Sequence, residues 1–140
     1  MALYRKLNRD TKQRKSILSG LTKTALTNGK VETTEERAKE ARKYIDKMIT
    51  YAKKGDLVSR RKALAFLEND TETVKYLFDT LAPKYAERNG GYTRIIKLAE
   101  RRGDDALMVV LTLVDQKEEV KEEKTSRKET KKAKKEEETK

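Results

Sequence analysis

The apolar residues in the first half of the chain recur every three or four positions, as in an α-helix with one buried face. This pattern predicts a first helix that begins at Asp10 or Thr11 and ends at Asn28-Gly29, a typical C-terminal stop. Residues 30–34 (KVETT) are β-branched and follow a glycine, so they predict a brief strand.

Three more helices are predicted before the chain reaches its only proline. The second has the capping-box spacing of Thr33 and Glu36 at its start and Gly55 at its end. Asp56 can cap a third helix and Asp70 a fourth, because Asp is a favoured N-cap residue. We expect Leu57, Leu64 and Leu67 of the third helix to face inward, residues 59–62 to face outward, and Pro83 to end or kink the fourth.

The periodicity changes after Gly90-Gly91. Residues 92–100 (YTRIIKLAE) favour a strand, residues 101–105 (RRGDD) a turn, and residues 107–115 (LMVVLTLVD) a second strand. The last run is nearly all apolar, which predicts a strand buried on both faces in the middle of a small sheet. From residue 116 onward the chain is almost only Lys, Glu and Thr, so we expect no packed core there. The chain therefore divides into an extended arm (1–9), a globular domain (10–115) and a disordered tail (116–140).

The composition argues against several classes of function. The 140 residues include no Cys and no His, which removes thiol nucleophiles, the commonest metal ligands and the commonest general base. We expect no catalytic residue, no metal, no cofactor and no small-molecule substrate. No apolar run is long enough to span a membrane.

The net charge of +11 is concentrated at one end of the chain. Residues 1–30 contain eight Lys or Arg residues against one acid, Asp10, the pattern of a basic arm that binds a polyanion. Such cations supply sequence-independent affinity for nucleic-acid phosphates. The candidate binding residues in this region are Arg5, Lys6, Asn8, Arg9, Lys12, Arg14 and Lys15.

Two further cationic groups are candidates. Arg60 and Arg61 lie in the third helix, and Arg101 and Arg102 lie at the tip of the predicted hairpin, where they can enter grooves of folded RNA. We also expect Tyr92 to be exposed and to stack on unpaired bases. Two other functions fit these residues less well: a nucleoid-type protein that binds DNA with its first helix, and an enzyme that holds a phosphate at Gly90-Gly91. That glycine pair lacks the spacing of a nucleotide-binding loop.

Several segments in order resemble the bacterial large-subunit ribosomal protein family conventionally numbered seventeen. They are LNRDTKQRKSILSGLTKTAL, VETTEERAKEARKYIDKMITYAKKGD, RRKALAFL and APKYAERNGGYTRIIKLAERRGDDALMVVLTLVD. The likeness runs from about Tyr4 to Asp115, and GGYTRI followed by RRGD and TLVD is its most specific part.

The resemblance implies an α+β domain in which a helix, a strand, three helices and two strands form a mixed three-stranded sheet. It implies a cytoplasmic, non-catalytic constituent of the large ribosomal subunit. The partners that it implies are large-subunit ribosomal RNA near the peptide exit side and neighbouring ribosomal proteins, including the small protein numbered thirty-two. The RNA-facing residues that it carries over are Arg9, Arg14, Arg60, Arg61, Arg88, Tyr92, Arg94 and Arg102.

Overall fold

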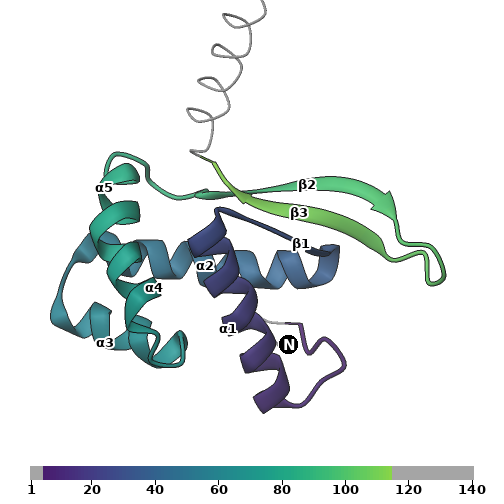
Figure 1. Cartoon of the computed structure of the whole chain (residues 1–140), viewed down its shortest axis with the longest axis horizontal. Helices are drawn as coiled ribbons and strands as arrows, with labels where there is room; N and C mark the ends of the chain where they lie inside the picture. The colour runs from purple at the N-terminus through teal and green to yellow at the C-terminus, as the bar shows by residue number, and fades with distance from the viewer. Residues whose placement is uncertain (1–4, 115–140) are drawn as a thin grey trace, which may run out of the picture.

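The structure, a computed structural model, describes residues 5–114 as helices packed against one face of a small sheet (Figure 1). The predicted α+β order of a helix, a strand, three helices and two strands is confirmed, with the third of those helices continuing through a π-helical turn into a short end segment. The expected tail, 116–140, lies outside the described residues. The elements are α1 (Thr11–Asn28), β1 (Lys30–Thr34), α2 (Glu35–Lys54), α3 (Leu57–Phe66), α4 (Thr71–Tyr76), η1 (Leu77–Leu81), α5 (Ala82–Lys84), β2 (Thr93–Glu100) and β3 (Leu107–Leu113).

The sheet has the strand order β1-β3-β2, so the last strand is the central one, as predicted. Both neighbouring pairs are antiparallel, and the expectation of a mixed sheet was therefore wrong. β1 and β2 run the same way but never pair, because β3 lies between them. The expectation that the central strand is buried on both faces was also wrong. Val109, Leu111 and Leu113 are buried, whereas the residues between them are partly exposed, because the helices cover one face of the sheet.

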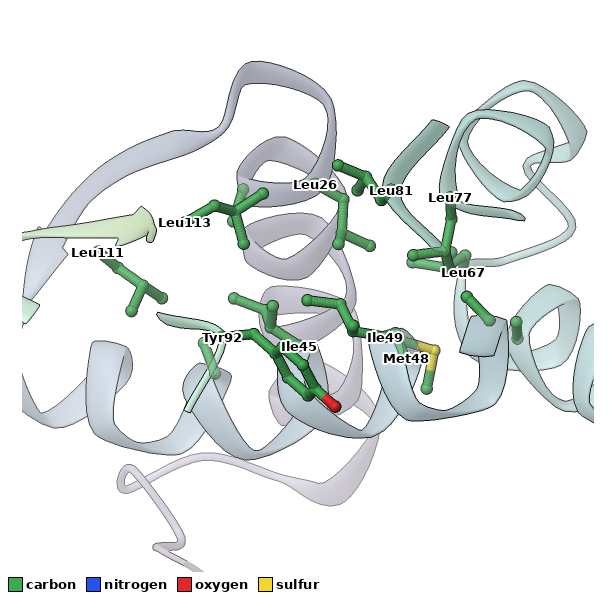
Figure 2. Close-up of a cluster of buried hydrophobic side chains, with 14 of the residues drawn as sticks. Leu26, Ile45, Met48, Ile49, Leu67, Leu77, Leu81, Tyr92, Leu111 and Leu113 are labelled. Atoms are coloured by element: carbon green, nitrogen blue, oxygen red, sulfur yellow. The ribbon is translucent and has the colours of Figure 1, made fainter. Parts of the chain in front are cut away.

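Helix α2 is the centre of the core. It packs against α1, α3, η1 and the sheet, and its buried Ile45, Met48 and Ile49 recur at helical spacing. Figure 2 shows these side chains among leucines from α1, η1 and β3. Full burial of one such side chain contributes about 1.5–3 kcal/mol, so the buried side chains around α2 contribute strongly to the stability of the fold.

Helix α3 is rotated relative to the predicted orientation. The Asp56 carboxylate accepts a hydrogen bond from the Ser59 backbone N–H at 3.0 Å, which confirms the cap and sets where the helix begins. From that start, Ser59 and Ala63 face the core about one helical turn apart, so the expectation that residue 59 faces outward was wrong. Leu57 then lies on the opposite side, with 63% of its surface exposed, and the expectation that it faces inward was wrong.

Candidate nucleic-acid interface

The described part of the predicted N-terminal arm is a turn that leads into α1. The Arg9 backbone N–H donates to the Lys6 carbonyl at 3.2 Å, and Leu7 and Asn8 both have positive φ. Leu7 packs against the core, and the Arg5 guanidinium forms an ion pair with Glu36 in the first turn of α2. The arm is therefore anchored at residues 5–9 and is less extended there than the sequence predicts.

The start of α1 gathers exposed positive charge. Its first turn contains no acid, and the N-cap residue Asp10 makes no side-chain capping hydrogen bond. Lys12 and Lys15 are exposed, and within residues 5–114 neither has an ion-pair partner. Arg14, on the same turn, is only partly exposed. These cations add to the positive end of the helix dipole, a disfavoured arrangement unless an anion binds there.

The α3 cations point in different directions. The Arg60 guanidinium lies 4.9 Å from the centre of the Phe78 ring in η1, and Lys62 Nζ lies 5.9 Å from the centre of the Tyr51 ring in α2. Arg61, between them, is exposed. Helical geometry thus separates three consecutive cations, and Arg61 is the one left without a contact to a described aromatic ring.

Residues 85–93, which we call the hinge, join the helices to β2, and α2 holds this segment at two points. Lys53 Nζ donates to the Arg88 carbonyl at 2.7 Å on one side of the glycine pair. On the other side, the Asp46 carboxylate accepts a hydrogen bond from the Thr93 hydroxyl at 3.5 Å. Burial raises the pKa of Asp46, and the neighbouring Arg42 opposes that rise. Asp46 and Lys53 are seven residues apart, so they lie on one face of α2.

Tyr92 is buried, and the expectation that its ring is exposed for base stacking was wrong. Only 4% of its surface is exposed. Its ring meets Tyr85 edge-on with centroids 5.3 Å apart, and Lys53 Nζ lies 5.7 Å from its centre. Tyr92 therefore anchors the hinge to the core, as Figure 2 shows. Nearby, Arg88 Nη1 is buried without a hydrogen-bond partner among the described residues, while Arg94 is exposed.

Of the two arginines at the hairpin tip, Arg101 is paired within the protein and Arg102 is available to a ligand. Arg101 pairs with Asp104 through two contacts, Nε to Oδ1 at 3.0 Å and Nη2 to Oδ2 at 2.6 Å. The hydrogen bond raises the pKa of Arg101 and lowers that of Asp104. This bidentate pairing occupies the guanidinium edge that a phosphate would use. Arg102 is exposed and makes no ion pair with another described residue.

The predicted binding residues do not form one patch. The start of α1, α3, the hinge and the hairpin tip are separate regions, and the tip lies at the end of the molecule opposite α3 (Figure 1). Sequence reasoning missed Lys53 and Asp46 as the residues that position the hinge. Their spacing on α2 was visible, but nothing local indicates which distant backbone they would meet.

Other kinds of site are not present in the part of the chain that the structure describes. Residues 5–114 hold no cluster of three acidic side chains arranged to bind a metal ion. None of the helices over the same range combines the length and apolar character that a membrane span needs.

Known proteins resemble this chain over most of its length. The family model described as ribosomal protein L17 matches residues 17–114. The "Large ribosomal subunit protein bL17" of Clostridium perfringens (strain SM101) is 60% identical over 114 residues, which cover 81% of this chain and 100% of the relative. The protein of the same name from Ligilactobacillus salivarius is 56% identical over 125 residues, covering 80% of this chain and 98% of the relative.

Proposed function

The chain belongs to the ribosomal protein L17 family, and from this premise we propose that it is a structural constituent of the large ribosomal subunit that binds folded ribosomal RNA. Members of this family are structural proteins and not enzymes. The match therefore gives no support to phosphate chemistry at the glycine pair or to a nucleoid-type role on DNA.

The observation that carries the RNA-binding proposal is the exposed charge at the start of α1. The first turn of α2 holds two acids, and the N-cap Asp56 of α3 accepts a capping hydrogen bond. At α1, in contrast, the N-cap Asp10 makes no side-chain cap, and exposed lysines follow it. The lysines add positive charge to the positive end of the helix dipole. A bound phosphate would offset the charge of the lysines and that of the helix end at once. We infer that this end of α1 is the main phosphate-binding surface, with Lys6, Arg9, Lys12 and Lys15 as its exposed cations.

The remaining predicted residues supply secondary contacts in this proposal. Arg61 on α3, Arg94 after the hinge and Arg102 at the tip are exposed cations that can each neutralise one phosphate. Tyr92 has no such role in its buried position, and Arg101 contributes little while Asp104 holds it. Because the regions are far apart, the protein would contact several RNA segments and hold them at a fixed separation.

Two finer elements of the proposal concern the surroundings of the protein. We expect it to act on the ribosome, which the names of its relatives mention, and in the cytoplasm. We also expect it to contact neighbouring proteins of the subunit, including the small one numbered thirty-two.

The salt dependence of RNA binding tests the proposed surface. Arg9→Ala and Lys12→Ala should each weaken binding to purified large-subunit ribosomal RNA, and each should lower the slope of log K against log salt by roughly 1. Lys75→Ala, which removes an exposed cation in the last turn of α4, is the matched control and should leave both quantities nearly unchanged. An unchanged slope for both test variants would exclude the start of α1 as the phosphate-binding surface.

A further inference from the structure

The face of the sheet turned away from the helices is charged near the hinge and becomes apolar toward the hairpin tip. On this face, the register of the three strands places side chains in cross-strand rows. The row nearest the hinge is Lys30, Thr112 and Arg94, with a cation on each edge. The next row is Glu32, Val110 and Ile96, so charge changes sign within one step along the sheet.

The apolar character continues toward the hairpin tip. Two residues of β2, Leu98 and Ala99, stand opposite Met108 of β3, which marks a β-bulge. Ile96 and Leu98 have 47% and 45% of their surfaces exposed. Val110 and Met108 beside them are partly exposed. These four residues, which we call the outer apolar patch, lie on β2 and β3 beside β1, and the hairpin continues from there beyond the helices (Figure 1).

The charges around the outer apolar patch do not suit RNA. Residues 97–107 contain three cations and three acids, and Arg101 is paired within the tip. Within residues 5–114, the exposed carboxylates of Glu32, in a row of this face, and Asp105, at the hairpin tip, have no ion-pair partner. A phosphate backbone would be repelled by them, whereas a cationic protein segment would be attracted.

We propose that the outer apolar patch is a docking surface for a basic, amphipathic segment of a neighbouring protein. Apolar side chains of that segment cover Ile96 and Leu98, and its Lys or Arg side chains pair with Glu32 or Asp105. This inference rests on the proposed function only in placing the chain in a particle with protein neighbours. The sheet face then separates the two kinds of partner, with RNA phosphates at the Lys30 and Arg94 row and protein at the outer apolar patch, while Arg102 at the tip stays available to RNA.

The partner covers the face of the sheet and does not extend it as a fourth strand. β2 is an edge strand, but the bulge at Leu98 and Ala99 interrupts its regular ladder, and Lys97 is an exposed charge on the same strand. Both features discourage strand addition. Exposed apolar side chains on a face suit contact with another folded or extended segment through side chains.

Site-specific photocrosslinking in assembled large subunits tests the docking surface. A photoreactive phenylalanine analogue at Ile96 or at Leu98 should give an adduct that protease removes and nuclease does not, with a crosslinked peptide rich in Lys and Arg. The same probe at Lys12 should give an adduct with RNA. An RNA adduct at Ile96 and Leu98, an acidic crosslinked peptide, or no adduct from either position would overturn the proposal. The Lys12 probe reports on the proposed function separately.

A second measurement does not depend on the probe. Ile96→Lys and Leu98→Lys place like charge against a basic partner and should reduce incorporation into large subunits, in competition with the unaltered chain, by about tenfold. Affinity for naked large-subunit RNA should stay the same or rise. Val58→Lys, which alters an exposed apolar residue on α3, is the control and should incorporate normally. Equal incorporation of all three variants would contradict the docking surface.

Discussion

Helices α1 and α4 both begin after an aspartate, but their N-terminal ends differ in their capping hydrogen bonds and in the sign of their nearby charges. At α4, Asp70 accepts hydrogen bonds from the Thr73 backbone N–H at 3.2 Å and the Thr73 hydroxyl at 2.8 Å, and it pairs with Lys23 of α1. Glu72 adds an acid in the first turn. At α1, Asp10 makes no side-chain cap, and cations follow it.

The difference separates a residue that stabilises the fold from residues that are available to a ligand. Asp70 satisfies a helix end, closes an ion pair and joins α1 to α4, so its interactions are complete within the protein. The α1 end keeps its backbone donors and its positive dipole, and it adds exposed lysines to them. Helix ends of this second kind bind anions in many proteins.

The largest expected effect comes from reversing charge at the α1 end. Lys12→Glu combined with Lys15→Glu should lower affinity for large-subunit ribosomal RNA by roughly ten- to a hundredfold at about 0.1 M salt, because two attractions become repulsions. The same change should raise the melting temperature slightly, since each acid near a helix N-terminus contributes about 0.3–1 kcal/mol. Filter binding and thermal unfolding by circular dichroism measure the two effects.

Opposite changes in binding and stability are the critical result of that experiment. A variant that loses RNA affinity and also melts earlier would mean that the lysines support the fold, and the comparison of the two helix ends would fail. Lys75→Glu serves as the control for charge alone. Lys75 lies inside the continuous helical segment from α4 through η1 to α5, so this change should affect both the melting temperature and RNA binding little.

An intermediate effect is expected from removing each aspartate. Asp70→Ala removes the α4 cap and leaves Lys23 without its partner, so the melting temperature should fall by several degrees with little change in RNA affinity. Asp10→Ala removes a side chain that makes no cap, so stability should change much less. Equal losses of stability in the two variants would show that the two helix ends are equivalent.

Most of the fold could be predicted from sequence patterns, because the residues that begin and end its helices act locally. The helix boundaries at Gly29 and Gly55 follow from glycine at positions with φ of 69°, which other residues adopt at a cost. The Asp56 and Asp70 caps depend on residues three positions away. The strand pairing and the phase of α3 depend on distant contacts, and there the predictions of a mixed sheet and of an inward Leu57 were wrong.

The candidate site was harder to predict for the same reason. Charge density along residues 1–30 is a property of the sequence and led directly to the α1 cations. Whether a given arginine is available is a property of the fold, and it depends on partners such as Asp104 for Arg101 and Glu36 for Arg5. The burial of Tyr92 results from Tyr85 and Lys53, and no spacing rule places those three together.

The smallest expected effect is the pH dependence of the stability that the Asp70 charge contributes at the α4 end. Hydrogen bonds from Lys23 and Thr73 lower the pKa of Asp70 from 3.8 to about 2. Because the folded state holds the lowered pKa, the stability that the charge contributes is present above about pH 4 and is lost as the pH falls from about 4 to about 2. Asp70→Asn keeps an oxygen that can cap the helix but has no charge to lose.

The measurement is the difference in melting temperature between the unaltered chain and Asp70→Asn at several pH values. That difference should be largest at pH 5 and above and should shrink toward pH 2, because protonation gives the unaltered chain a neutral side chain as well. Comparing the two proteins cancels acid effects from other carboxylates, such as Glu35, Asp56 and Asp104, whose pKa values are also lowered. A constant difference down to pH 2 would mean that the α4 end is held by its hydrogen bonds and packing, and that the Asp70 charge contributes nothing to the contrast with α1.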